Sequence, residues 1–289
     1  MIRLIKYLRR WLLSDIYHNE TSTQCLINTE VNEVLSDIAR IDEKAVILSG
    51  RKVYSQCDED GIIEEIFNRI GTTNKTFIEI GCGKGLENNT HYLLLKGWKG
   101  VWVDGSNNNI RFIKNQIGYR EGHNEKLSIA QSYIDRDNVN QILKENLGQI
   151  AHEGPTIDFL SVDIDGNDLE VLSHIDVVNA RLICVEYNAK FPPGVHQKIK
   201  YDPTHRWQGD DYQGSSLAAI HSLMESKGYT LVSCSIAGTN AFFVKNEDVA
   251  HIDVLPFEKY YMPARYHLCH KESGLPASLK FLKNILCDQ

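Results

Sequence analysis

The sequence predicts an α/β fold, with a mostly parallel sheet of seven strands that ends in an antiparallel hairpin and helices on both faces. Short apolar runs alternate with helical or loop-rich segments over residues 76–233, an order typical of a parallel sheet wrapped by helices. The last two runs, 229–233 and 241–245, are joined by a link of a few residues around Gly238. Because so short a link joins only antiparallel neighbours, the sheet is expected to end in a hairpin.

The predicted elements follow from hydrophobic periodicity and from their start and stop signals. Helices are expected at 54–70, 91–95, 139–150 and 217–227, with a further helix around Leu169–Leu172. Strands are expected at 76–80, 100–103, 127–131, 159–162, 182–185, 229–233 and 241–245.

Composition sets limits on organisation and partners. We expect a helical extension over residues 1–50, a main domain over 51–246 and a tail over 247–289 with a short helix at 279–286. A net charge of -7 without a long basic run argues against nucleic-acid binding. The 7 cysteines form no C-x-x-C pair, and no run is as long as the roughly 18 apolar residues of a membrane span. These features predict a cytoplasmic protein with reduced thiols.

Residues 1–13 have the pattern of a basic amphipathic helix. One face carries Ile2, Ile5, Leu8 and Leu12, another carries Arg3, Lys6 and Arg10, and Trp11 lies at the border. This pattern suits peripheral contact with an anionic membrane, here the inner membrane face. It suits equally well a helix packed on its own domain or on a second copy in a homodimer, and the sequence leaves these alternatives open.

The segment TFIEIGCGKG, residues 76–85, organises the main domain as strand, glycine loop and helix. Gly81, Gly83 and Gly85 have the spacing G-x-G-x-G, whereas the dinucleotide fingerprint is G-x-G-x-x-G. Glu79 would repel a pyrophosphate but suits a ligand with an ammonium group and a sulfonium, such as S-adenosylmethionine. Glycine turns also end strands for structural reasons alone.

Three more residues are candidates for cofactor contact. Asp104 ends the strand at 100–103, about 25 residues after Glu79, which fits a hydrogen bond to a ribose diol of either S-adenosylmethionine or NAD. Gln131 ends the next strand. Gln56, near the start of the helix at 54–70, is a further polar group that a helix cap at Ser55 or Asp58 does not need, so it is a candidate for contact with the ligand.

Acids and an amide follow two neighbouring strands. Asp163 and Asp165 follow the strand at 159–162, and Glu186 and Asn188 follow the strand at 182–185. Asp163 and Glu186 are expected to lie next to each other on adjacent strands, and two carboxylates at such a short distance need a shared proton, a metal or a cationic ligand. They are therefore candidate catalytic residues, with Asp165 and Asn188 as substrate contacts. Asp163, Glu186 and Asn188 also form a candidate site for Mg²⁺ or Mn²⁺. The alternative is that the acids only bind backbone amides or the cofactor amine.

The loop over residues 189–214 is longer than usual for such a connection. Its aromatic and polar residues suit a sugar-sized substrate, and Tyr201 and Trp207 are the predicted contacts. His205 is the candidate base near neutral pH, with Asp202 as the alternative, although a loop histidine is often only solvated.

Six motifs from Tyr54 to Val244 together resemble the FkbM-type methyltransferases, a family with the class I, Rossmann-like S-adenosylmethionine fold. They are YSQCDEDGIIEEIF, FIEIGCGKGLENNT, GWKGVWVDGS, FLSVDIDGND, ICVEYNAKFPP with YDPTHRW, and GTNAFFV. The resemblance implies cofactor contacts at Glu79, Gly81, Gly83, Gly85 and Asp104. The family's commoner fourth-strand motif is D-x-E-G-x-E, and the departure to DIDGND affects the catalytic assignment.

These observations predict an S-adenosylmethionine-dependent enzyme that methylates a hydroxyl of a saccharide or another small polar metabolite. The resemblance implies O-methylation as the usual activity but does not carry the substrate over. Two alternatives stay open. One is an NAD(P)-dependent oxidoreductase acting on a sugar, and the other is a non-catalytic glycan-binding module on a methyltransferase scaffold.

Overall fold

In the computed structural model, the described residues form a seven-stranded sheet in the order β3-β2-β1-β4-β5-β7-β6. It describes residues 2–118, 125–150, 152–269 and 277–287, with side chains from residue 22 onward. The pairs from β3 to β5 are parallel, and β7 is antiparallel to both β5 and β6. The predicted Rossmann-like class, a mostly parallel sheet ending in an antiparallel hairpin, is confirmed. The strands are β1 Thr76–Ile80, β2 Lys99–Asp104, β3 Leu127–Gln131, β4 Thr156–Val162, β5 Asn179–Glu186, β6 Tyr229–Cys234 and β7 Asn240–Lys245.

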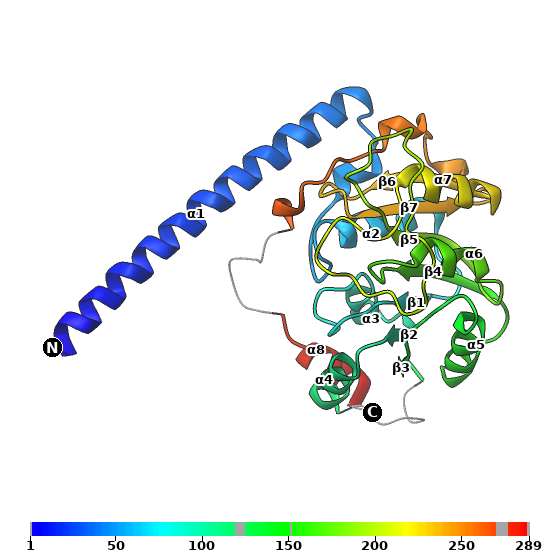
Figure 1. Cartoon of the computed structure of the whole chain (residues 1–289), viewed down its shortest axis with the longest axis horizontal. Coiled ribbons are helices and arrows are strands. Elements are labelled where there is room, and N and C mark those ends of the chain that lie inside the picture. Colours follow the sequence, from blue (N-terminus) through cyan, green and yellow to red (C-terminus); the bar gives the residue numbers. More distant parts are fainter. Residues whose placement is uncertain (1, 119–124, 151, 270–276, 288–289) are drawn as a thin grey trace.

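Helices cover both faces of the sheet, as Figure 1 shows, with α2, α3 and α4 on one side and α5, α6 and α7 on the other. Their bounds are α1 Ile2–Ile41, α2 Glu59–Ile70, α3 His91–Leu95, α4 Asn107–Ile117, α5 Val139–Gln149, α6 Asp168–His174, α7 Leu217–Ser226 and α8 Lys280–Cys287. This layering buries both faces of the parallel strands, which is why those strands read as continuous apolar runs.

Helix α4 is absent from the sequence-based prediction, although its signals are present. Ser106 caps it by accepting a hydrogen bond from the Asn109 amide at 3.4 Å. Three isoleucines at helical spacing are buried, and Gly118 ends the helix with φ 66°. The asparagine-rich first turn has weak helix propensity, so the periodicity of the buried residues was the stronger signal.

Helix α2 begins at Glu59, directly after Asp58, the later of the two predicted cap positions, because a buried carboxylate folds the preceding segment. Asp60 Oδ2 accepts hydrogen bonds from the amides of Val53, Tyr54 and Ser55 at 2.7, 2.6 and 2.8 Å. Asp58 does not cap the helix, since its carboxylate accepts from the Ile236 amide instead. The start of α2 is thereby tied to the β6–β7 hairpin.

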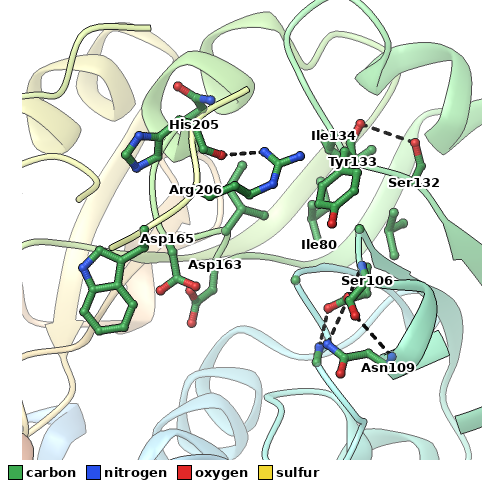
Figure 2. A pocket seen from close by; sticks show the side chains of 18 of the residues that line it. Ile80, Ser106, Asn109, Ser132, Tyr133, Ile134, Asp163, Asp165, His205 and Arg206 are labelled. Atoms are coloured by element: carbon green, nitrogen blue, oxygen red, sulfur yellow. Dashed lines mark hydrogen bonds between the residues drawn. The ribbon is translucent and has the colours of Figure 1, made fainter. Parts of the chain in front are cut away.

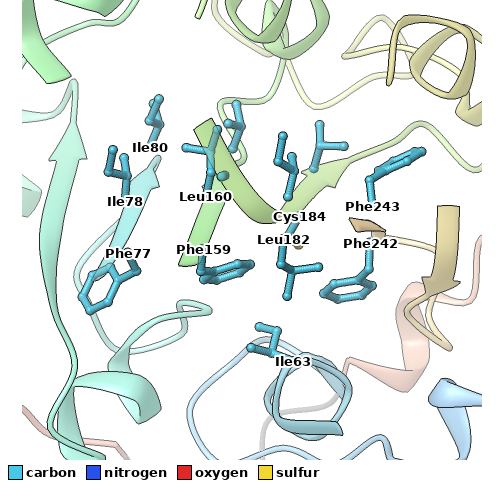
Figure 3. Close-up of a cluster of buried hydrophobic side chains, with 14 of the residues drawn as sticks. Ile63, Phe77, Ile78, Ile80, Phe159, Leu160, Leu182, Cys184, Phe242 and Phe243 are labelled. Atoms are coloured by element: carbon cyan, nitrogen blue, oxygen red, sulfur yellow. The ribbon is translucent and has the colours of Figure 1, made fainter. Parts of the chain in front are cut away.

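The core forms where α2 packs on the sheet. Phe77, Phe159, Leu182 and Phe242, from β1, β4, β5 and β7, project toward Ile63 of α2 (Figure 3). All five side chains are essentially inaccessible to solvent. Burying each large apolar side chain stabilises the fold by about 1.5–3 kcal/mol, so this layer fixes the strands that carry the carboxyl-edge residues.

Helix α1 is continuous from Ile2 to Ile41 and extends away from the body of the protein in Figure 1. Its second half packs on the core through Ile27, and Glu30 accepts a hydrogen bond from His267 at 2.8 Å. The predicted membrane contact through residues 1–13 falls on side chains outside those described. Within the described part of the chain, no helix combines the length and apolarity that crossing a membrane requires.

The tail packs against the main domain. The Tyr187 hydroxyl donates to the Met262 carbonyl, and the Tyr261 hydroxyl donates to the Ala189 carbonyl, both at 2.7 Å. Helix α8 lies on α4, where the Cys287 thiol donates to the Ile117 carbonyl at 2.8 Å. The tail therefore buttresses the end of β5, and the predicted boundary between residues 246 and 247 stays a prediction.

Candidate functional site

A cavity of about 460 Å³ opens at the carboxyl edge of the sheet, where the segments after β1 to β5 converge (Figure 2). A volume of this size suits a small-molecule ligand. The sequence-predicted residues that line it are Gln56, Gly81, Gly83, Asp104, Asp163, Asp165, His205 and Trp207. Glu79, Gly85, Gln131, Glu186, Asn188 and Tyr201 are not among the lining residues.

Glycine is required at the three positions after β1 for different structural reasons. All three have positive φ, from 57° to 92°. A Cβ on Gly81 would lie 1.6 Å from the Asp163 carbonyl oxygen, and a Cβ on Gly85 would lie 2.7 Å from the Trp102 ring. No atom of the described residues lies within 4 Å of the corresponding position at Gly83. Gly81 and Gly85 therefore permit close packing, whereas Gly83 leaves backbone open to a ligand.

Asp104, at the end of β2, faces the glycine loop. Its carboxylate accepts hydrogen bonds from the amides of Gly83 at 2.9 Å and Ser106 at 2.7 Å, and from the Asn109 side chain at 3.2 Å. Each oxygen of a carboxylate has more than one acceptor direction, so these bonds orient the group and leave it able to accept from a ligand.

Glu79 is buried in β1 and faces the 88–90 segment. Its carboxylate accepts hydrogen bonds from the Asn88 side chain and the Asn89 amide, both at 2.8 Å, and from the Thr90 hydroxyl. Burial raises the pKa of Glu79 to about 7, against the opposing effect of these bonds. In this structure the carboxylate organises the loop that follows the glycines.

Three carboxylates cluster at the ends of β4 and β5. One oxygen each from Asp163, Asp165 and Glu186 lies within 4.8 Å of the others. Figure 2 shows the side chains of Asp163 and Asp165 side by side. Asp165 has φ 55°, an uncommon backbone conformation for a residue other than glycine. Among the described residues no salt bridge reaches this cluster, and the Glu186 Oε2 atom is buried without a hydrogen-bond partner.

The electrostatics of this cluster follow from burial and like charge. Burial, followed by the charges of nearby acids, raises the pKa values of Asp163 and Glu186 well above their usual range. Burial also raises the pKa of Asp165, although the nearby His205 opposes the shift. A divalent cation or a cationic ligand would relieve this repulsion, as would one shared proton.

Two residues predicted to contact ligands are engaged within the protein. The Asn188 side-chain amide donates to the carbonyls of Asp211 and Gln213, at 3.0 and 3.1 Å. The Gln131 amide donates to the Gly105 carbonyl at 3.0 Å. These two side chains stabilise the loops around the cavity and do not themselves line it.

The loop over residues 189–214 brings His205 to the cavity, beside Asp165. Gly166 makes room for this ring, since a Cβ there would lie 2.4 Å from His205 Cδ2. The Trp207 indole lines the cavity and is 46% exposed. Tyr201 lies away from the cavity wall, under the guanidinium of Arg136, whose carbon is 4.1 Å from the ring centroid.

The sequence-based prediction missed several lining residues. Among them are Ser106 and Asn109 at the start of α4 and Tyr133 after β3, and also Arg206 of the long loop, which was not one of the predicted contacts. The first two were missed together with α4. Tyr133 follows Gln131 at a strand end, a position that could have identified it.

No protein-family model matches the chain, and no curated protein matches it. Among solved structures it is similar to the magnesium protoporphyrin IX methyltransferase of Synechocystis PCC 6803 with bound SAM (11% identity, 65% of this chain, 77% of that chain, TM-score 0.39). It is also similar to a SAM-dependent methyltransferase from Aquifex aeolicus (12% identity, 72% of this chain, 96% of that chain, TM-score 0.36). A third similar structure is the O-methyltransferase from Bacillus cereus in complex with SAH (14% identity, 74% of this chain, 91% of that chain, TM-score 0.40). At such identities and TM-scores, these likenesses carry no argument about activity.

Proposed function

We propose that this chain is an S-adenosylmethionine-dependent methyltransferase that methylates a hydroxyl of a small polar acceptor, with a saccharide as the best-fitting class. The observation that carries the proposal is the division of the cavity. Ser106 and Asn109, the hydrogen-bond partners of Asp104, lie on one side of the cavity in Figure 2, and Asp163 and His205 lie on the other; Gly83 and Trp207 also line it. The resemblance to FkbM-type methyltransferases supports the same assignment.

The residues present fit this cofactor. Gly83 leaves open backbone, and Asp104 is an oriented acceptor for a ribose diol. The nearby carboxylates lack a cationic partner among the described residues, which favours a ligand with an ammonium group and a sulfonium and disfavours an anionic pyrophosphate. When bound, S-adenosylmethionine supplies an electrophilic methyl group.

The protein's own groups supply position and proton transfer. Asp104 binds the diol, and the Trp207 ring offers an apolar face for a sugar. A ring nitrogen of His205 accepts the proton of the acceptor hydroxyl. The segment around His205 covers one side of the cavity, and its placement fixes the distance between base and acceptor.

A divalent cation is a second part of the proposal. Asp163, Asp165 and Glu186 offer three hard oxygen ligands, and the unpartnered Oε2 of Glu186 is the observation that favours a ligand there. Asp165 takes the place of Asn188, a metal ligand in the sequence-based prediction, because both ends of the Asn188 amide are bound within the loop: its nitrogen donates to two carbonyls and its oxygen accepts from the Lys190 amide at 3.2 Å. A cation at this site would lower the pKa of an acceptor hydroxyl.

Isothermal titration with S-adenosylmethionine, S-adenosylhomocysteine and NAD tests the cofactor assignment. We expect binding of the first two, and tight NAD binding without S-adenosylmethionine binding would refute it. Formation of S-adenosylhomocysteine over a panel of sugar nucleotides then tests turnover. Cofactor and glycan binding without turnover would favour the non-catalytic module.

The cation is tested by dialysis against EDTA, followed by titration of Mg²⁺ or Mn²⁺ into the metal-free protein. We expect binding heat in the native protein and none in Glu186→Gln. Asp37→Asn, an exposed acid on α1, is the control. Full activity of a demonstrably metal-free enzyme would eliminate the cation and leave His205 as the only proton acceptor of the proposal.

A further inference from the structure

Two arginine–tyrosine stacks connect the long loop to the segment that follows β3. The Arg206 guanidinium carbon lies 3.8 Å from the Tyr133 ring centroid, and the Arg136 guanidinium carbon lies 4.1 Å from the Tyr201 ring centroid. Each of the two segments contributes one arginine and one tyrosine. The pairing is therefore reciprocal and holds the loop at two points.

Other contacts place His205 between these two points and the end of β4. The Asn167 side chain donates to the Asp202 carbonyl at 2.8 Å, and the His205 amide donates to the same carbonyl at 2.9 Å. The Arg206 guanidinium also donates to the His205 carbonyl at 2.5 Å. The ring of His205 packs on Gly166. The orientation of His205 thus depends on the position of the loop backbone on both sides of it.

One of the two stacks also reaches the opposite wall of the cavity. A Cβ on Gly105 would lie 2.2 Å from the Tyr133 ring, so this ring packs on the backbone directly after Asp104. Figure 2 shows Arg206 between the side of the cavity that carries His205 and the side that carries Tyr133. The loop is therefore held against the wall that the proposed function assigns to the cofactor.

We propose that Tyr133, Arg136, Tyr201 and Arg206 form an arginine–tyrosine latch that positions His205 at the acceptor half of the cavity. This inference rests on the proposed function. Arg136 and Tyr201 are positioning residues, since neither lines the cavity. Their stack is a cation–π contact, which depends on a positive charge over an aromatic face and not on the tyrosine hydroxyl.

This chemistry provides a matched set of variants at the stack farther from the cavity. Tyr201→Phe and Arg136→Lys keep a ring and a cation, whereas Tyr201→Ala and Arg136→Ala remove one of them. Hydrogen exchange is the first measurement, because it requires no activity. In the alanine variants we expect the amides of residues 201–212, including that of His205, to exchange roughly 2- to 30-fold faster, the range for one cation–π contact. The phenylalanine variant should exchange like the native protein.

Turnover separates positioning from general loss of structure. We expect the alanine variants to lower kcat by a similar factor, with an unchanged Kd for S-adenosylmethionine and an unchanged melting temperature. Tyr201→Phe should keep the native kcat. Native exchange and kcat in both alanine variants would overturn the latch, and so would an equal loss in Tyr201→Phe and Tyr201→Ala. If the native protein shows no turnover while exchange still distinguishes Ala from Phe, the latch stands and the proposed function fails.

Discussion

The two ends of β4 carry acids with opposite surroundings. Asp158, near the amino edge, is inaccessible to solvent and accepts hydrogen bonds from the amides of Thr73, Asn74 and Lys75. It also lies 3.2 Å from the Arg181 guanidinium. Asp163, just past the carboxyl edge, has two further carboxylates beside it and no salt bridge among the described residues. One acid is fully paired by the protein, and the other is not.

The difference separates a residue that stabilises the fold from residues available to a ligand. Arg181 also pairs with Asp248 at 2.8 Å and donates to the carbonyls of Ile70 and Gly71 at the end of α2, so the amino edge joins distant segments. At the carboxyl edge, an arginine paired in the same way would neutralise the carboxylates and leave no negative charge to bind a ligand. A carboxylate that lines a cavity without a salt bridge and has a raised pKa, as Asp163 does, is typical of a functional site.

The largest expected effect is at the amino edge. Asp158→Ala should lower the free energy of unfolding by about 3–5 kcal/mol, because three amides lose their common acceptor and the largely buried Arg181 loses one of its two carboxylate partners. Urea denaturation measures this. Asp37→Ala, which breaks an exposed pair with Arg40, should change stability by no more than about 0.5 kcal/mol. Similar losses in the two variants would remove the distinction between the two edges.

The next effect is on binding at the carboxyl edge. Asp104→Ala should weaken S-adenosylmethionine binding by about 1.5–3 kcal/mol, roughly ten- to a hundred-fold, because hydrogen bonds to a charged group are lost. Asp104→Asn keeps the shape of the side chain and should lose less. Titration calorimetry on folded protein measures both, and native affinity in Asp104→Ala would exclude this residue from the site.

Two glycines permit a matched comparison of backbone strain. Gly83 at the carboxyl edge and Gly97 at the amino edge have φ of 57° and 81°, with nothing within 4 Å of the position that a Cβ would take. Alanine should therefore lower stability at either site by about 1–2 kcal/mol. Only Gly83→Ala should also weaken S-adenosylmethionine binding, by about tenfold. Equal affinities of the two variants would show that no ligand lies against Gly83.

The smallest expected effect is a gain in stability, whereas the variants above lose stability or affinity. The pKa of Asp163 is raised in the folded protein, so the folded state binds its proton more tightly than the unfolded state does. Its contribution to stability is complete below the unfolded pKa and is lost as pH rises through the folded pKa. Asp163→Asn should therefore stabilise the protein by about 1 kcal/mol at pH 8 and by less at pH 4, while it abolishes cation binding. Thermal unfolding across pH decides this, and a gain that is independent of pH would contradict it.

The sequence by itself determined the sheet and the edge of the sheet at which the cavity lies. Apolar runs and the short link around Gly238 specify parallel strands and a final hairpin, because these are constraints on neighbouring residues. The acids and glycines at strand ends then fall on one edge, since the carboxyl ends of parallel strands meet there. Asp104, Asp163 and Gly83 were found in this way.

Only the tertiary structure decided which side chains meet. Glu79 binds the 88–90 segment, Asn188 binds its own loop, and Tyr201 stacks on Arg136 instead of lining the cavity. Asp165 approaches Asp163 and Glu186 because of its own positive φ and the register of β4 against β5. Such contacts join residues far apart in the chain, so they depend on strand register and on loop paths. A local sequence pattern does not encode either of these.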